Sequence, residues 1–206
     1  MLKAFVAGCG LTRVAPDCRW RNRWRPLVNA RRSADKTEPN VIEIRPEQPG
    51  DVSAVRDVNR RAFGQDQEAS IVDALRTNGA TLLSLVAIFD RAVIGHIMYS
   101  PLLVGDVMGA ALGPMAVLPE HQRQGVGSSL VEAGTRHLTH RGYPFIVVLG
   151  HSTFYPRFGF RPARTYGITC EWDVPDDVFM VLVLDEAKMS RVVGVAKYRT
   201  EFSTVS

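Results

Sequence analysis

Apolar residues recur along the chain with two periods, one helical and one extended. Val41–Arg45 alternates apolar and polar residues, which predicts a strand at the start of the folded body. Apolar positions 52, 55, 58 and 62 predict a helix over Val52–Phe63, with Asp51 as an acidic N-cap and Gly64 as its end. A second, short helix is expected over Glu68–Leu75.

Three β-rich runs and a long amphipathic helix follow. Leu82–Phe89 and Ala92–Val104 are joined by a short polar turn, which predicts a hairpin. A third strand is expected over Leu112–Val117. From Val126 the apolar residues return at helical spacing, and Gly142 is the expected end of this helix.

The pattern in the last third of the chain predicts mainly strands and little helix. Phe145–Leu149 is continuously apolar, as in a strand buried on both faces, and a crossover helix makes it a parallel neighbour of the strand before it. A helical turn is expected over Thr153–Phe158, then strands over Phe160–Cys170 and Val178–Leu184. Val192–Tyr198 alternates and suits either a strand or a contact surface.

Positive charge is concentrated at one end of the chain. Residues 1–36 hold seven Arg and two Lys against two Asp, a net charge of +7, so the remainder carries −3 of the total of +4. The basicity therefore belongs to a tail, which argues against a nucleic-acid-binding face on the body. Residues 1–40 are interpreted as a basic extension, with an organellar transit segment as the alternative, and residues 41–206 as one domain.

Cysteine usage and hydropathy restrict the class of protein further. Cys9, Cys18 and Cys170 form no CxxC pair, which argues against a zinc site and a disulfide framework. No apolar run approaches the roughly 20 residues that a membrane-spanning helix needs. We therefore expect a cytoplasmic protein with no metal and no membrane partner.

The junction from the strand at 112–117 into the following helix carries the most chemical information. Two glycines flank Val126 at the helix start, and no Asp or Glu lies between Gln122 and Ser129. Free N–H groups and the positive end of the helix dipole meet there, which predicts a phosphate site. A Walker A loop would need a lysine, and a dinucleotide fingerprint would need glycine where Leu130 stands.

With its strand, Pro119 and the spacing Gln-x-x-Gly-x-Gly, this junction resembles the pyrophosphate-binding motif of the GNAT superfamily of N-acetyltransferases. The resemblance implies a mixed α/β (α+β) fold with a mostly antiparallel sheet and a parallel pair at the central strands. It also implies acetyl-coenzyme A as co-substrate. The residues that it assigns to the coenzyme are Met115, Ala116, Val117, Gln122, Arg123, Gln124, Gly125, Val126, Gly127 and Ser128.

A second segment, Tyr155-Pro156-Arg157-Phe158-Gly159-Phe160, is similar to the Tyr-x-x-x-Gly-Phe segment after the fifth strand of the same family. There the tyrosine often gives a proton to the departing thiolate, so the resemblance implies a catalytic Tyr155. Where the family frequently has asparagine, about seven residues earlier, this chain has Val148.

The sequence does not single out a base that would deprotonate an acceptor amine. Glu68, His96 and His151 qualify only by their chemistry, and none is favoured over a solvated or core role. The acidic segment 171–177 is interpreted as a solvated hairpin tip, with attraction of a cationic acceptor as the alternative.

These observations predict an N-acetyltransferase in which an amine of a small molecule, or an amino group, attacks acetyl-coenzyme A directly in a ternary complex. One alternative is a GNAT-fold sensor that binds coenzyme A without catalysis. The other is an unrelated α/β nucleotide-binding domain. A homodimer is compatible with the sequence.

Overall fold

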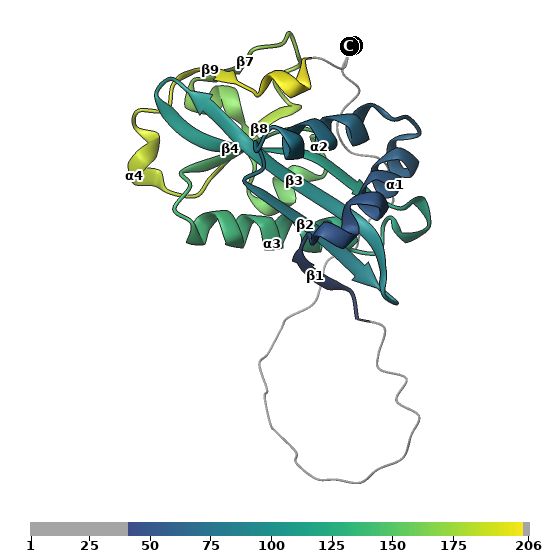
Figure 1. Cartoon of the computed structure of the whole chain (residues 1–206). Helices are drawn as coiled ribbons and strands as arrows, with labels where there is room; N and C mark the ends of the chain where they lie inside the picture. Colours follow the sequence, from purple (N-terminus) through teal and green to yellow (C-terminus); the bar gives the residue numbers. More distant parts are fainter. Residues whose placement is uncertain (1–40, 204–206) are drawn as a thin grey trace, which may run out of the picture.

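The computed structural model describes residues 41–203, which form a nine-stranded sheet with helices on both faces (Figure 1). The strands are β1 (Glu43–Pro46), β2 (Leu83–Phe89), β3 (Ala92–Val104), β4 (Val107–Val117), β5 (Phe145–Leu149), β6 (Arg161–Pro162), β7 (Ile168–Cys170), β8 (Phe179–Val183) and β9 (Gly194–Lys197). The helices are α1 (Val52–Phe63), α2 (Gln67–Thr77), α3 (Val126–His140) and α4 (Glu186–Met189). Five 3-10 turns complete the described elements: η1 (Pro49–Asp51), η2 (Pro119–His121), η3 (Tyr155–Phe158), η4 (Ala163–Tyr166) and η5 (Thr200–Phe202).

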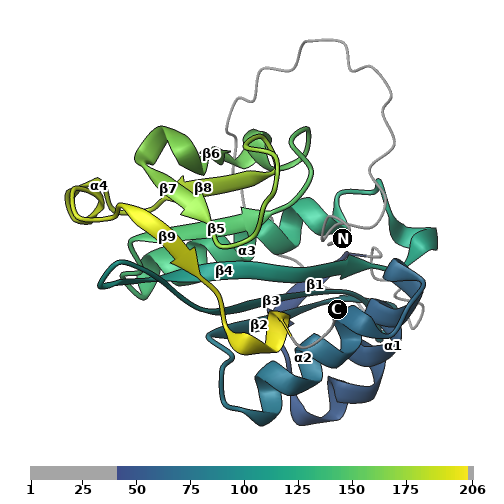
Figure 2. The same ribbon diagram turned by 90° about the horizontal axis from the view of Figure 1, so that it is seen from above.

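The strand order is β1-β2-β3-β4-β5-β8-β6, and β9 joins β7 to β3. The central β4–β5 pair is parallel and most neighbouring pairs are antiparallel, which confirms the expected fold class. A second parallel pair, β7–β9, was not expected from the sequence. Seen from above, α1 and α2 lie on one side of the strands and α3 on the other (Figure 2). Each side has its own buried apolar cluster.

The first helix follows its sequence pattern closely. α1 spans the predicted Val52–Phe63, and Gly64 ends it at φ 71°, with its N–H donating to the Arg60 carbonyl. Asp51 occupies the predicted N-cap position, but its carboxylate makes no N-cap hydrogen bond to the helix. It is held instead by Arg45, at 2.6 Å from Nη1, and by the N–H of Gln48.

Several strand boundaries differ from the expected ones. β4 begins at Val107 rather than Leu112, because residues 107–111 pair with residues 100–104 of β3. Gly109 leaves room for the Phe145 ring of β5, since a Cβ there would lie 2.2 Å from that ring. The single strand predicted over Phe160–Cys170 is wrong: two short strands, β6 and β7, flank the turn η4.

Within the segment Val192–Tyr198, for which a strand was one of two expectations, Gly194–Lys197 forms β9. It pairs with both β3 and β7, so this segment belongs to the sheet, while Val193 and Val195 remain exposed. The expectations for residues 1–40 lie outside the described residues. Within residues 41–203, no helix has the length and apolar character to cross a bilayer, and no cluster of three metal-ligating side chains occurs.

Candidate active site

The central feature of the site is the place where β4 and β5 separate. These strands pair only from Ala110–Leu112 to Ile146–Val148. Beyond Leu112, Gly113 and Pro114 form a bulge opposite Met98, and β4 continues alongside β3 alone. The β4 edge over Met115–Val117 is therefore turned toward a gap instead of a neighbouring strand.

Hydrogen-bond alternation defines which backbone groups face that gap. The Leu118 N–H donates to the Ile94 carbonyl, so Ala116 forms the next hydrogen-bonded pair with β3. The N–H groups of Met115 and Val117 consequently point away from β3, toward the gap. The Val117 carbonyl, on the same edge, accepts from Gln122 Nε2 at 3.0 Å. Gln122 thus fastens the glycine loop to the end of β4.

The loop itself turns through two left-handed residues, Arg123 at φ 61° and Gly125 at φ 89°. α3 starts directly afterwards with no side-chain cap. Ser129 is the first residue whose N–H reaches a carbonyl of this turn, that of Gly125 at 3.0 Å. The N–H groups of the three preceding residues, 126–128, therefore form the open N-terminal turn, where the helix dipole is positive. This arrangement suits an anion.

Arg157, for which the sequence predicted no role, lies at the same turn. Arg157 Nη2 donates to Ser128 Oγ at 2.8 Å, and its guanidinium carbon lies 5.0 Å from the Phe154 ring centre and 5.4 Å from that of Phe158. Two aromatic rings and one hydroxyl orient this cation beside the helix start. The motif Tyr-Pro-Arg-Phe-Gly-Phe contains it, but its place depends on a contact across 29 residues.

Tyr155 lies at the start of η3, with its ring against the backbone of Gly150 just after β5. A Cβ at Gly150 would lie 2.3 Å from that ring. The side chain is fully buried, in edge contact with Phe154 at 5.1 Å and Phe160 at 5.4 Å. Its hydroxyl has no hydrogen-bond partner among residues 41–203. Burial raises the pKa of Tyr155 well above its ordinary value, so the phenol remains protonated.

The three sequence segments of the candidate site meet at Gly127. An atom added at its Cβ position would lie 3.5 Å from Met115 Cε and 3.6 Å from Phe154 Cζ. The strand edge, the start of α3 and the tyrosine segment are therefore in van der Waals reach of one another. The structure brings together what the sequence places about 10 to 40 residues apart.

The histidines considered as bases have other surroundings. His96 is fully buried, with Nδ1 3.0 Å from Asn59 Nδ2 and Nε2 3.0 Å from Ser84 Oγ. Burial lowers the pKa of His96 to about 3, so its imidazole is neutral at neutral pH. The carbonyl of His151 accepts from Phe154 N–H in the turn before η3. Glu68 is 4% exposed and opens α2.

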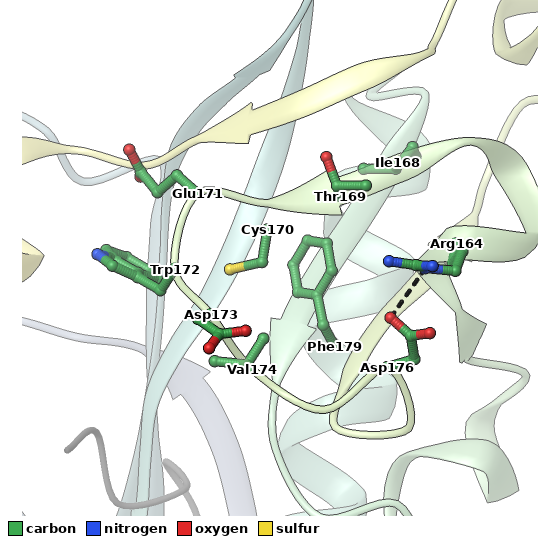
Figure 3. A pocket seen from close by; sticks show the side chains of 10 residues that line it. All are labelled: Arg164, Ile168, Thr169, Cys170, Glu171, Trp172, Asp173, Val174, Asp176 and Phe179. Atoms are coloured by element: carbon green, nitrogen blue, oxygen red, sulfur yellow. Dashed lines mark ion pairs between the residues drawn. The ribbon is translucent and has the colours of Figure 1, made fainter.

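The acidic segment borders a cavity of about 290 Å³, which is also lined by residues of β7 and by Phe179 of β8 (Figure 3). Trp172 and Phe179 form apolar walls, and Arg164 pairs with Asp176 at 2.9 Å on one side. The Glu171 carboxylate accepts from the Tyr198 N–H at 2.7 Å. Glu171 is therefore tied to the end of β9, whereas Asp173, Asp176 and Asp177 are exposed, as expected for a solvated segment. The segment is not a hairpin tip, because β7 pairs with β9 and not with β8.

The split sheet, the open β4 edge and the uncapped start of α3 have the geometry that suits an extended, phosphate-bearing ligand. Residues 81–162 match the family model for an acetyltransferase (GNAT) domain. The uncharacterized N-acetyltransferase YhbS of Escherichia coli K12 is 34% identical over 163 residues, which is 78% of this chain and 98% of the relative. YjhQ of the same strain, also named an uncharacterized N-acetyltransferase, is 37% identical over 134 residues, 62% of this chain and 74% of the relative.

Solved structures agree with this relationship. The crystal structure of Escherichia coli YhbS in complex with CoA has a TM-score of 0.77 at 34% identity, covering 82% of this chain and 96% of that chain. A GNAT family acetyltransferase from Brucella melitensis in complex with acetyl-CoA has a TM-score of 0.67 at 34% identity, covering 79% and 99%. The chain therefore belongs to the GNAT family of acetyltransferases. It is accordingly an acyltransferase, which confirms the enzyme class expected from the two sequence motifs.

Proposed function

We propose that this protein transfers an acetyl group from acetyl-coenzyme A to an amine of a small molecule, or to an amino group, by direct attack in a ternary complex. The observation that carries the proposal is the open β4 edge at Met115–Val117, which runs into the anion site at the start of α3. A strand edge offers hydrogen bonds to an amide-bearing arm, and the helix start offers them to phosphates.

The coenzyme contacts follow from these groups. The pyrophosphate lies on the loop formed by Gln122, Arg123, Gln124, Gly125, Val126, Gly127 and Ser128, bound chiefly by backbone N–H groups. The pantetheine arm lies along Met115, Ala116 and Val117 as an added strand. Arg157 adds a full positive charge beside Ser128, where a charge-assisted hydrogen bond to phosphate is geometrically available.

In direct acyl transfer the enzyme contributes mainly by orienting the two reactants, and no covalent enzyme intermediate is needed. The amine lone pair forms the C–N bond at the acetyl carbon, while the C–S bond breaks and its electron pair leaves on sulfur. The N–H groups of Met115 and Val117, which point into the gap, are the available donors for the carbonyl oxygen as it gains negative charge.

Tyr155 is proposed as the donor to the departing sulfur. Because its pKa is raised by burial, it holds its proton more tightly than a thiol of pKa about 8.5 would. A resting phenolate is therefore unfavourable. The phenol instead donates a hydrogen bond to the sulfur, and any proton that it passes on is replaced by one released from the attacking nitrogen.

A matched pair of variants tests the coenzyme site. Gly127→Glu places bulk and negative charge at the anion site, whereas Gly127→Gln adds the same bulk without charge. Calorimetric titration with acetyl-coenzyme A should show no saturable binding to Gly127→Glu and weakened but measurable binding to Gly127→Gln. Wild-type affinity in Gly127→Glu would show that the phosphates bind elsewhere.

Catalysis is tested separately from binding, by thiol release from acetyl-coenzyme A across a library of primary amines. Release that depends on the amine, with mass-spectrometric detection of the acetylated product, supports the proposed reaction. Tight binding of acetyl-coenzyme A with no release for any amine would contradict it and favour the non-catalytic sensor.

A further inference from the structure

Three glutamates of the described chain are almost fully withdrawn from water, and one of them has a different kind of partner. Glu47, with 8% of its side chain exposed, is bound by Arg76 at 2.6 Å. Glu201 is 3% exposed and is bound by Arg199 at 2.9 Å. Glu68, at 4%, receives hydrogen bonds only from the neutral amide of Gln65, at 3.0 and 3.1 Å to its two oxygens.

No Arg, Lys or His within residues 41–203 pairs with Glu68. The arginine of α1 in this region, Arg56, is engaged by Asp66 and Asp73 instead. Withdrawing a carboxylate from water without a counter-charge costs several kcal/mol, and the first turn of α2 returns only part of that through its dipole. A carboxylate held by a neutral amide keeps its negative charge available to a cationic ligand, whereas arginines already neutralise Glu47 and Glu201.

The topology places Glu68 on the face from which an acceptor can approach. The C-terminal end of α1 is fastened to the end of β4 by Arg61 Nη2 and Glu120 Oε1 at 2.8 Å. The connection from α1 to α2, which leads into Glu68, therefore begins at the end of the sheet where β4 and β5 separate. Two buried residues further along α2, Ile71 and Val72, pack in the cluster that contains Leu149 of β5. This is the face opposite α3 (Figure 2).

Resting on the acetyl transfer proposed above, we propose that Glu68 is the base that removes the proton from the acceptor's ammonium group. The donor then approaches the gap from the α3 side and the acceptor from the α2 side. Gln65 donates to both carboxylate oxygens, which orients the carboxylate and leaves its remaining lone pairs for the ammonium proton, directly or through one water.

Both protons that leave the acceptor nitrogen in this reaction are accounted for. The ammonium gives one proton to Glu68 and attacks the acetyl carbon as a neutral amine. Once the C–N bond has formed, the nitrogen loses a second proton, which ends on the coenzyme sulfur as the C–S bond breaks. The products are the N-acetylated acceptor, coenzyme A thiol and one proton on Glu68, which is released to solvent before the next turnover. The acceptor class implied is an amine that is cationic in solution.

The experiment compares Glu68→Gln with wild type, using the amine that gives the highest thiol release, over a range of pH. At pH 7 the variant should lose 10²- to 10⁴-fold in kcat/KM for the amine, with acetyl-coenzyme A affinity nearly unchanged. Its rate should then climb about tenfold per pH unit up to the amine's own pKa, because only amine already neutral in solution can react. Glu68→Asp should restore part of the rate at pH 7.

Glu47→Gln is the matched control, since it also removes the charge of a buried glutamate. It should melt at a lower temperature, because Arg76 keeps only one of its two carboxylate partners, that of Asp73, and should keep the wild-type shape of the pH profile. Glu68→Gln should melt at or above the wild-type temperature, because no cation is left unpaired.

Wild-type kcat/KM at pH 7 in Glu68→Gln, or a reduced rate with an unchanged pH profile, would overturn the assignment while leaving the proposed acetyl transfer intact. Absence of thiol release in the wild-type protein would overturn both.

Discussion

Replacing Tyr155 by phenylalanine should affect folding and catalysis in opposite directions. The change removes one oxygen atom from a fully buried side chain, and that oxygen has no hydrogen-bond partner among residues 41–203. The ring keeps its edge contacts with Phe154 and Phe160. Its shape also still fits against Gly150, so no cavity is created.

The magnitude for folding follows from the unsatisfied hydroxyl. A buried polar group without a partner costs about 1–3 kcal/mol, so its removal should raise the free energy of unfolding by about 1 kcal/mol or more. For a domain of this size, 1 kcal/mol corresponds to a rise in Tm of about 2–4 °C. For catalysis, loss of one preorganised donor to developing charge should lower kcat by about 10²-fold. The affinity for acetyl-coenzyme A should remain close to wild type.

The same substitution should change the response to alkaline pH. The pKa of Tyr155 is raised in the folded protein, whereas a tyrosine in the unfolded chain ionises near pH 10. Folding stability linked to this group is therefore fully present below about pH 10 and is lost as pH rises further, because unfolding then releases a proton. Phenylalanine cannot ionise, so the stability advantage of the variant should widen above about pH 10.

Thermal melting at pH 7 and pH 10.5, together with thiol release at saturating acetyl-coenzyme A, measures both effects. A variant that melts below the wild type would mean that the hydroxyl is satisfied in the folded protein. Unchanged kcat would reject Tyr155 as the donor, whatever the melting temperature.

Three further outcomes are expected. Arg157→Gln should weaken coenzyme A binding about tenfold or more, and Arg157→Lys should have an intermediate effect. Pantetheine, which lacks the pyrophosphate, should bind the wild type and both variants equally well. Titration calorimetry measures these affinities, and an equal loss of pantetheine binding would contradict a phosphate contact. Gly134→Ala should destabilise the protein by about 1–3 kcal/mol, despite the higher helix propensity of alanine, because its Cβ would lie 2.2 Å from the Tyr99 hydroxyl; a raised Tm would show that this ring can move. The pKa of His96 is lowered by burial to about 3, below the 6.5 of an unfolded histidine, so stability is present above pH 6.5 and falls below it by up to about 1.4 kcal/mol per pH unit. Urea melts of wild type and His96→Gln between pH 7 and pH 4 measure this slope, and parallel losses in the two proteins would refute it.

Much of the fold could be predicted from local patterns. The bounds of α1 follow from its apolar spacing and from Gly64, which ends it in a left-handed conformation. The β2–β3 hairpin and the buried strand β5 were recognisable in the same way, from a polar turn and from an unbroken apolar run. Each of these features is encoded within one short run of consecutive residues, so a single sequence window contains the information.

Local patterns gave wrong predictions where contacts between distant segments decide the structure. The stretch 160–170 is rich in β-forming residues, yet the turn η4 divides it into two short strands, each of which pairs with a partner that comes later in the chain. Asp51 is a residue type that often caps helices, but Arg45 on β1 binds its carboxylate, which therefore does not cap α1. Neither outcome could be read from the neighbouring residues.

For the site, the sequence by itself determined the coenzyme loop, because the glycines, Gln122 and the helix start lie within a few residues of one another. The family that this motif indicated is confirmed, while the roles of the individual residues stay predictions. Only the tertiary structure decided that Arg157 reaches Ser128, that Tyr155 loses all contact with water, and that Glu68 is buried without a cation. The physical reason is that charge compensation and burial depend on which segments pack together, and the chain order does not record that.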